Sequence, residues 1–350
     1  MIKVGIMNVT GYAGGELARL LYSHPETRLT SVTGRSEAGK RLADVFPHLA
    51  CYELKIAPEL DLVDFVYSAL PHAASAEAVA PLVRAGVPVV DISADFRLRD
   101  PAEYAAWYGV EHPAPDLLQQ AVYGLTELNR APVQHGRLVA NPGCYPEAAL
   151  LALAPAANAG VIEHDVVIDS KSGVTGAGRG LSLTTHLGEA GESVSAYGLS
   201  GHRHLPEIVQ ELAKCFPPVE APQPVHPRVT FTPHLVPITR GILSTCYAPL
   251  TPAWAAENRE PGKAIRSLYE EFYAGEPFVR VTDAPPATKH TRGSNMCLVY
   301  PTVDERARRL VVVSVLDNLV KGAAGQAIQN MNAMLGLPET LGLDMPAVYP

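Results

Sequence analysis

The chain has 350 residues, of which 47% are apolar and 18% charged, and its formal net charge at pH 7 is −8. A length above about 250–300 residues predicts two domains, because single hydrophobic cores rarely grow larger, and the apolar fraction argues against a disordered protein. The acidic balance, without a Lys/Arg cluster, argues against nucleic-acid binding, and no run approaches the roughly 18 uninterrupted apolar residues of a membrane span.

Strand-like and helix-like patterns alternate through the N-terminal part of the chain. Short apolar runs predict buried strands at 3–7, 65–70 and 87–92, and the segment 28–33 is expected to form the second strand. A leucine stripe predicts a helix over 14–23, and an alanine-rich stretch predicts another over 73–85. Because strands that alternate with helices pair in parallel through right-handed crossovers, this part is predicted to form an α/β, Rossmann-like parallel sheet.

The turn after the first strand carries a partial dinucleotide-binding motif. Gly11 and Gly14 have the spacing of glycines that let a pyrophosphate approach a helix N-terminus. The earlier glycine of the usual motif is replaced by Asn8, and asparagine tolerates a left-handed backbone better than most residues. An ordinary helix start in an α/β protein is the alternative interpretation.

Basic and polar residues follow the second strand, where NAD sites usually carry an acidic residue for the ribose 2′-hydroxyl. Arg35, Ser36 and Lys40 could instead bind a 2′-phosphate, which favours NADP(H). Glu37 lies among them and would suit an NAD ribose. A solvated basic turn is the alternative without a ligand.

The pattern changes after residue 141. A helix is expected over 146–157, and strands are expected at 166–170, 228–232, 244–250 and 310–315, which indicates an α+β domain with a mixed or antiparallel sheet. The polar segment 172–201 is too long for a simple connection, which is typical of functional loops. The Pro-rich segment 217–227 is expected to be a surface loop, and 317–335 a final helix.

Cys144 stands in the turn-rich segment Asn-Pro-Gly-Cys-Tyr-Pro, just before a helix expected to begin at Pro146. A thiol at a helix N-terminus has a lowered pKa and is a candidate nucleophile, whereas most lone cysteines are buried and inert. The other cysteines are expected to be structural. An odd, sparse set of thiols and the lack of a signal-peptide pattern predict a cytoplasmic protein.

Two histidines provide candidate bases for that thiol. His202 and His204 are two residues apart, so on an extended segment both side chains would point the same way. A metal site is the alternative, but no third ligand has ordinary spacing, so no metal is expected. Which imidazole acts is left open.

Three further segments could bind an anion. Ser93 and Arg97 directly follow a strand, where parallel sheets place ligand-binding loops. The segment 172–179 could wrap an anion with backbone N–H groups, and Arg240 is a second guanidinium candidate. The alternatives are a surface arginine paired with Asp95 or Asp100, and a flexible loop.

Six motifs, in this order, resemble N-acetyl-γ-glutamyl-phosphate reductases, of the semialdehyde dehydrogenase group. They are SADFRL at 93–98, NPGCYP at 141–146, SGVTGAGR at 172–179, HRHLPEI at 202–208, PHLVPITRGI at 233–242 and DNLVKGAAGQA at 317–327. The resemblance implies NADPH-dependent reduction of N-acetylglutamyl 5-phosphate to the 5-semialdehyde in arginine biosynthesis, with phosphate release. It also implies a homo-oligomer, a dimer or tetramer, and no nucleic-acid or membrane partner.

The resemblance also implies a function for each domain and for individual residues. Residues 1–146 would bind NADP, completed by the C-terminal segment 317–350, and 147–316 would form the catalytic and dimerisation domain. Cys144 would be the nucleophile, with His202 and His204 beside it. The residues expected to bind substrate are Ser93, Arg97, Ser172, Glu207 and Arg240. Those expected to bind the cofactor are Thr10, Gly11, Tyr12, Ala13, Gly14, Arg35, Ser36, Lys40, Pro71, Gly176, Asn318, Lys321 and Gly322.

Three other functions stay open from the sequence. A related reductase of lysine biosynthesis acts on a carrier-protein-bound aminoadipyl phosphate, but its cysteine segment lacks the Pro-Gly and Tyr-Pro found here. A non-catalytic NADP-binding sensor could share the fold. A hydride-transfer enzyme without a covalent intermediate would not need Cys144.

Overall fold

The computed structural model describes residues 1–218 and 226–350, so most of the expected surface loop at 217–227 lies outside the described residues. The chain divides into two units. The first joins Met1–Gly143 to Leu319–Met345, and the second joins Cys144–Asn318 to Pro346–Pro350. We describe each by itself.

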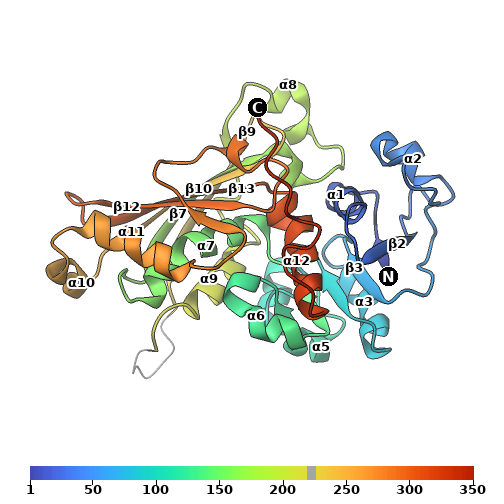
Figure 1. Cartoon of the computed structure of the whole chain (residues 1–350), viewed down its shortest axis with the longest axis horizontal. Helices are drawn as coiled ribbons and strands as arrows, with labels where there is room; N and C mark the ends of the chain where they lie inside the picture. Colours follow the sequence, from blue (N-terminus) through green and yellow to red (C-terminus); the bar gives the residue numbers. More distant parts are fainter. Residues whose placement is uncertain (219–225) are drawn as a thin grey trace. The chain divides into compact units, whose positions relative to one another are not determined.

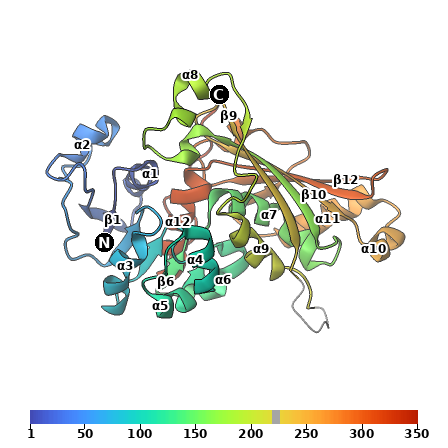
Figure 2. The same ribbon diagram turned by 180° about the vertical axis from the view of Figure 1, so that it is seen from behind.

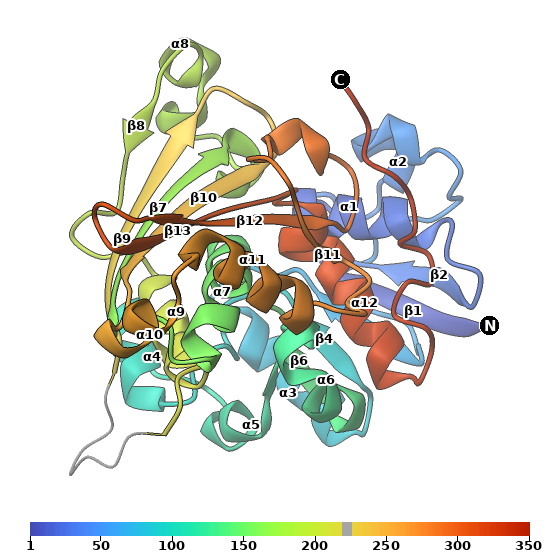
Figure 3. The ribbon, with the colours of Figure 1, turned by 60° about the vertical axis from the view of Figure 1, so that its left-hand side comes forward.

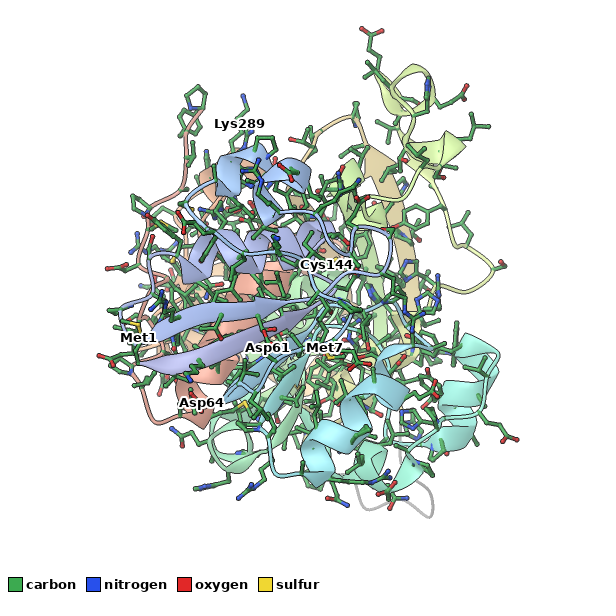
Figure 4. The ribbon with its side chains drawn as sticks, turned by 90° about the vertical axis from the view of Figure 1, so that its right-hand side faces the viewer. Met1, Met7, Asp61, Asp64, Cys144 and Lys289 are labelled. Atoms are coloured by element: carbon green, nitrogen blue, oxygen red, sulfur yellow. The ribbon has the colours of Figure 1, made fainter. Side chains whose placement is uncertain are left out.

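The first unit is built on a parallel sheet. Its strands are β1 (Ile2–Met7), β2 (Thr27–Val32), β3 (Phe65–Ser68), β4 (Val89–Asp91), β5 (Val122–Tyr123) and β6 (Leu138–Ala140). In the described residues they take the order β2-β1-β3-β4-β6-β5, and all neighbours are parallel. Figure 4 labels Met1 and Met7 at the two ends of β1, and Asp64 just before β3. The expected parallel α/β sheet is therefore confirmed.

Helices cover both faces of this sheet (Figure 2). They are α1 (Tyr12–Leu21), α2 (Leu42–Val45), η1 (Pro47–Leu49), α3 (Ser75–Arg84), α4 (Pro101–Tyr108), α5 (Pro115–Gln120) and α6 (Thr126–His135). Val66 and Val89 pack with α3 and α5 in a buried apolar cluster. The neighbouring side chain in β3, Tyr67, points to the opposite face and donates to Sδ of Met331 at 3.0 Å.

The C-terminal segment completes this unit. The helix expected over 317–335 consists of a π-helical turn, η5 (Val320–Ala324), followed by α12 (Gly325–Met334). Its predicted apolar face is buried throughout, at Leu319, Val320, Ala323, Ala327, Ile328 and Met331. Figure 1 shows α12 in red, lying along α6.

The second unit is built on a mixed sheet. Its strands are β7 (Asp165–Gly173), β8 (Ser195–Ala196), β9 (Arg228–Val236), β10 (Ile242–Pro249), β11 (Val279–Val281), β12 (Cys297–Asp304) and β13 (Arg309–Leu316). In the described residues their order is β11-β12-β13-β10-β7-β9-β8, with parallel and antiparallel pairs. The expected mixed sheet is confirmed, although β11 and β12 were not predicted from the sequence.

Helices pack against the mixed sheet (Figure 3). They are α7 (Cys144–Asn158), α9 (Leu205–Ala213), α10 (Pro252–Glu257) and α11 (Pro261–Phe272), with η4 (Thr288–His290) in a loop. Along β10, buried Ile242, Ser244, Cys246 and Ala248 alternate with half-buried residues. The buried residues of β10 thus lie on the face that packs against the helices, and the residues on its other face are partly exposed.

The segment 172–201 is more structured than a simple loop. It contains η2 (Val174–Ala177), η3 (Leu183–Thr185), α8 (Leu187–Ala190) and β8, which pairs with β9. Several of its apolar side chains are largely exposed: Leu181, Leu183, Leu187, Val194 and Leu199. Within the part of the chain that the structure describes, no helix is long and apolar enough to cross a membrane.

Candidate functional site

The turn after β1 has the geometry that the sequence predicted. Asn8 has φ +61°, in the left-handed region where the usual motif has glycine. Its side chain holds this conformation, because Nδ2 donates to the Ala69 carbonyl at 2.8 Å and Oδ1 accepts from Thr10 at 3.2 Å. A Cβ at Gly14 would lie 2.5 Å from the Asn8 carbonyl oxygen. Glycine is therefore required for α1 to begin this close to the strand.

The N-terminus of α1 suits an anion. Gly11 is its N-cap, and Tyr12 and Ala13 form its first turn together with Gly14. In this described helix, neither a capping side chain nor an acidic residue occupies the first turn. The backbone N–H groups and the positive end of the helix dipole are thus available to a phosphate.

The residues after β2 suit a 2′-phosphate better than a bare ribose. Arg35, Ser36 and Lys40 are exposed in the turn. Glu37, which the sequence offered as a ribose ligand, forms an ion pair with Lys40 at 2.5 Å. Pro71, another expected cofactor residue, is exposed between β3 and α3. The first unit therefore fits NADP(H) at α1 and at the end of β2.

Cys144 is the first residue of α7, so the helix starts two residues earlier than predicted. Cys144 is partly exposed. It lies on the first turn of the helix, where the helix dipole favours a thiolate. The other cysteines differ from it. Cys246 and Cys297 are buried, and burial raises the pKa of Cys215 to about 12. Cys51 is exposed, so it does not pack in the core.

Tyr145 connects the start of α7 to both imidazoles. Its ring centroid lies 5.8 Å from that of His202 and 5.9 Å from that of His204. The two imidazole centroids are 4.9 Å apart. Phe231, from β9, closes the cluster at 5.4 Å from Tyr145 and 5.3 Å from His202. The two proposed bases thus lie against Tyr145, the residue that follows the proposed nucleophile Cys144. A contact of either imidazole with the thiol stays a prediction.

The two histidines have different surroundings. The backbone N–H of His204 donates to Nδ1 of His202 at 3.1 Å, so a neutral His202 carries its proton on Nε2. Desolvation by burial, followed by the nearby charge of Arg203, lowers the pKa of His202 to about 4. His202 is therefore neutral at physiological pH. His204 is the N-cap of α9.

A tyrosine pair beside Cys144 was not predicted from the sequence. The Tyr197 hydroxyl donates to that of Tyr145 at 2.9 Å, and the Tyr197 ring lies 5.5 Å from His202. Burial, partly offset by the hydrogen bond to Tyr145, raises the pKa of Tyr197 to about 12, and the charge of Cys144 contributes to this shift. Tyr197 therefore belongs to the same site, and both hydroxyls remain protonated at neutral pH.

The residues at the end of β4 and after it make buried hydrogen bonds with one another and with α3, all within the first unit. The hydroxyl of Ser93 donates to Asp91 at 2.6 Å. The Asp95 carboxylate accepts from the N–H groups of Ala73, Ser75 and Ala76 at 2.7–2.9 Å, which caps α3. Asp95 is thus tied to α3, whereas the sequence allowed it to pair with Arg97 on the surface.

Arg97 is only 7% exposed, so it is not a surface arginine. Its Nε donates to the Asn141 carbonyl at 2.9 Å, and Nη2 donates to the Ile92 carbonyl at 2.8 Å. The guanidinium thus ties the loop after β4 to the turn that leads to Cys144. Its expected contact with substrate stays a prediction.

The remaining candidates of the second unit lie near the end of β7. Asn318 joins two loops: its Oδ1 accepts from the N–H of Gly241, and its Nδ2 donates to Thr175. A Cβ at Gly176 would lie 3.0 Å from Oγ of Ser172. Arg240 forms an ion pair with buried Asp317 at 3.5 Å. Ser172 and Glu207 are both buried.

Lys321 is held inside the first unit. It is fully buried, and its Nζ lies 2.6 Å from Glu127, 2.6 Å from Gln326 and 2.8 Å from Gln329. An ammonium group has three N–H donors, so these acceptors account for all of them. These contacts support the helix that bears Gly322, and the expected place of Lys321 near the cofactor stays a prediction.

Curated relatives match this chain over its whole length. The chain is 55% identical over 349 residues to the N-acetyl-γ-glutamyl-phosphate reductase of Dehalococcoides mccartyi (strain CBDB1), covering 99% of both chains. It is 48% identical to the enzyme of the same name from Heliobacterium modesticaldum, covering both chains completely. The chain belongs to the N-acetyl-γ-glutamyl-phosphate reductase family. The resemblance drawn from its motifs is confirmed.

Domain families agree with this membership. The semialdehyde dehydrogenase NAD-binding domain matches residues 3–135 of this reductase-family chain, and the semialdehyde dehydrogenase dimerisation domain matches residues 144–318. Solved structures share the fold. Aspartate semialdehyde dehydrogenase II from Vibrio cholerae gives a TM-score of 0.66 at 17% identity, covering 96% of this chain and 99% of that chain. The Candida albicans aspartate semialdehyde dehydrogenase, solved with NADP, gives 0.66 at 17%, covering 97% and 99%.

Proposed function

We propose that this protein reduces N-acetyl-L-glutamyl 5-phosphate to N-acetyl-L-glutamate 5-semialdehyde in arginine biosynthesis, with NADPH as reductant and release of inorganic phosphate. The observation that carries this proposal is Cys144 at the first turn of α7, where the next residue, Tyr145, lies in one ring cluster with His202 and His204. When bound, NADPH would supply the hydride. The residues of this chain would supply the nucleophile, the proton transfer and the anion contacts.

Cys144 attacks first in this proposal. Its thiolate forms a bond to the acyl carbon, and the bond from that carbon to the phosphate oxygen breaks, so phosphate leaves and a thioester remains. Reduction adds two electrons and one hydrogen to that carbon. The carbon–sulfur bond then breaks, which releases the aldehyde and restores Cys144.

His204 is proposed as the acid and base. His202 cannot easily accept a proton at neutral pH, because its pKa lies near 4 and Nδ1 already accepts from the backbone of His204. Its neutral Nε2–H can still donate to a developing oxyanion. The arrangement therefore assigns proton transfer to His204 and hydrogen-bond donation to His202.

The reverse reaction tests this function directly. We expect N-acetylglutamate semialdehyde, phosphate and NADP to give NADPH, and aspartate semialdehyde or NAD to give far slower turnover. Preference for aspartate semialdehyde, or for an aminoadipate semialdehyde, would contradict the proposed substrate. Tight NADPH binding without turnover of any acyl phosphate or aldehyde would instead indicate a sensor.

Cofactor preference gives a prediction for Arg35. Replacing Arg35 with Ala should raise the KM for NADPH about ten- to a hundredfold, because one charge-assisted hydrogen bond to a 2′-phosphate would be lost. The KM for NADH should change little. Arg28→Ala is the matched control, since Arg28 is also exposed on β2 and its removal changes the net charge equally. Equal effects on both cofactors would argue against a 2′-phosphate at Arg35.

We also propose a cytoplasmic homo-oligomer. The mixed sheet carries a half-buried row on the face opposite to its buried residues: Thr302 pairs with Val311, Val311 with Tyr247, and Tyr247 with Val167. Apolar rows of this kind are typical of surfaces that a second copy covers. The family description of residues 144–318 as a dimerisation domain supports this assignment.

The oligomer proposal predicts the effect of a charge on that face. Val313 lies two residues from Val311 on β13, so it belongs to the same half-buried face. Val313→Lys should lower the molar mass in solution to that of the monomer, because a buried ammonium without a partner would oppose association. Light scattering after size-exclusion chromatography measures this. Leu62→Lys, at a 98% exposed position in the first unit, is the control and should leave the mass unchanged. An unaltered mass for Val313→Lys would exclude this face.

A further inference from the structure

The turn that carries the proposed nucleophile begins at Asn141, whose polar groups all have partners. Its N–H donates to the Asp91 carbonyl at 2.8 Å, and its carbonyl accepts from Nε of Arg97 at 2.9 Å. Its side-chain amide donates to the Ala323 carbonyl at 3.1 Å and accepts from Nδ2 of Asn330 at 3.0 Å. Because Asn141 is fully buried, these four bonds fix the chain three residues before the nucleophile.

Both polar atoms of the Asn330 side-chain amide make hydrogen bonds. Its Nδ2 donates to the Gly124 carbonyl at 2.8 Å, and its Oδ1 accepts from Oγ1 of Thr126 at 2.8 Å. Gln326, one turn earlier on α12, donates to the same two groups at 2.9 and 2.8 Å. The contact from Asn330 to Asn141 joins residues 189 positions apart in the sequence. A series of buried hydrogen bonds therefore connects Gln326 and Asn330 of the C-terminal helix to the turn before Cys144.

We propose that Asn330 is a positioning residue of the reaction, which holds Asn141 so that Cys144 stands at the first turn of α7. A helix terminus favours an anion only within about one turn, so the thiolate depends on where this turn lies. A displacement of about 1 Å in a catalytic group can cost about a hundredfold in rate. The inference rests on the proposed function, because Asn330 has this task only if Cys144 is the nucleophile.

Asn332 offers a matched control on the same helix. It is also fully buried, and its amide makes three hydrogen bonds, with Nε2 of His24 and the carbonyls of Glu339 and Leu341. Among these described contacts, none reaches the turn that carries Cys144. The change from Asn to Ser at either position removes a similar buried amide, so both variants should lose similar stability.

The experiment compares Asn330→Ser with Asn332→Ser in a Cys51→Ser background, which removes the exposed thiol. We expect Asn330→Ser to lower kcat about ten- to a hundredfold with little change in KM, and to slow the alkylation of Cys144 by iodoacetamide by a similar factor. Asn332→Ser should keep both rates within about twofold. Thermal melting should shift both variants alike.

Equal rates of alkylation and turnover for the two variants would overturn the assignment. A fall in activity without slower alkylation of Cys144 would do the same, since it would locate the effect elsewhere. The alkylation step needs no substrate, so it tests Asn330 even if the acyl phosphate assigned here is wrong. Conversely, failure of the wild-type protein to turn over this substrate would count only against the proposed function.

Discussion

Replacing Cys144 with Ser lowers turnover about a thousandfold or more in our account. A serine hydroxyl at the start of α7 is not ionised at neutral pH and is a far weaker nucleophile than a thiolate, so the covalent acyl intermediate forms far more slowly. Binding of NADPH should persist, because its proposed contacts lie at α1 and after β2. Steady-state rates and fluorescence titration of NADPH measure the two effects separately.

Controls for this prediction come from the other thiols. Cys51→Ser removes an exposed cysteine of the first unit, and Cys215→Ser removes one whose pKa burial raises to about 12. Both variants should turn over at nearly the wild-type rate. Substantial turnover in Cys144→Ser, or inactivation by Cys51→Ser, would exclude the covalent route through Cys144.

Replacing His204 with Asn should lower kcat about a hundred- to ten-thousandfold, the range for loss of a general acid and base. The pH profile should also lose the limb that reports the proposed general acid and base. His202→Asn is the comparison. Asparagine can still accept from the backbone N–H of residue 204, so we expect a loss of about tenfold and a pH profile of unchanged shape.

The pH profile of kcat distinguishes the proposed roles of the two imidazoles. His202 has its pKa near 4, so it gains a proton only in acid, and its removal cannot abolish a limb near neutrality. If His202→Asn abolished that limb and His204→Asn kept it, the assignment of roles would be reversed. Loss of the limb in neither variant would place the acid and base elsewhere.

Local signals predicted much of the fold and the site. Apolar runs predicted β1, β3 and β4, because buried parallel strands are continuous apolar stretches. Asn8 was expected to accept a left-handed backbone, and its φ of +61° bears this out. The clustering of His202 and His204 was likewise visible in their spacing. These features depend on neighbours in the sequence, which is why the sequence reveals them.

Other features depend on contacts between distant segments. Tyr197 lies in a polar stretch with no motif of its own, and only the folded unit brings its hydroxyl to Tyr145. Within β12, Pro301 argues against a central strand, so that strand was not predicted. The three acceptors of Lys321, in α6 and α12, come from segments that its own motif does not reveal. The resemblance to the family identifies motifs in this sequence. It does not reveal which polar groups of those motifs are already hydrogen-bonded within the protein.

The most direct measurement is the mass of the protein after incubation with N-acetylglutamyl 5-phosphate in the absence of NADPH. Our account predicts a gain of one N-acetylglutamyl group, located by peptide mapping on Cys144 and removed when NADPH is added. Cys144→Ser should gain nothing. A wild-type protein that reduces the substrate but never carries this group, or carries it on another residue, would contradict the account.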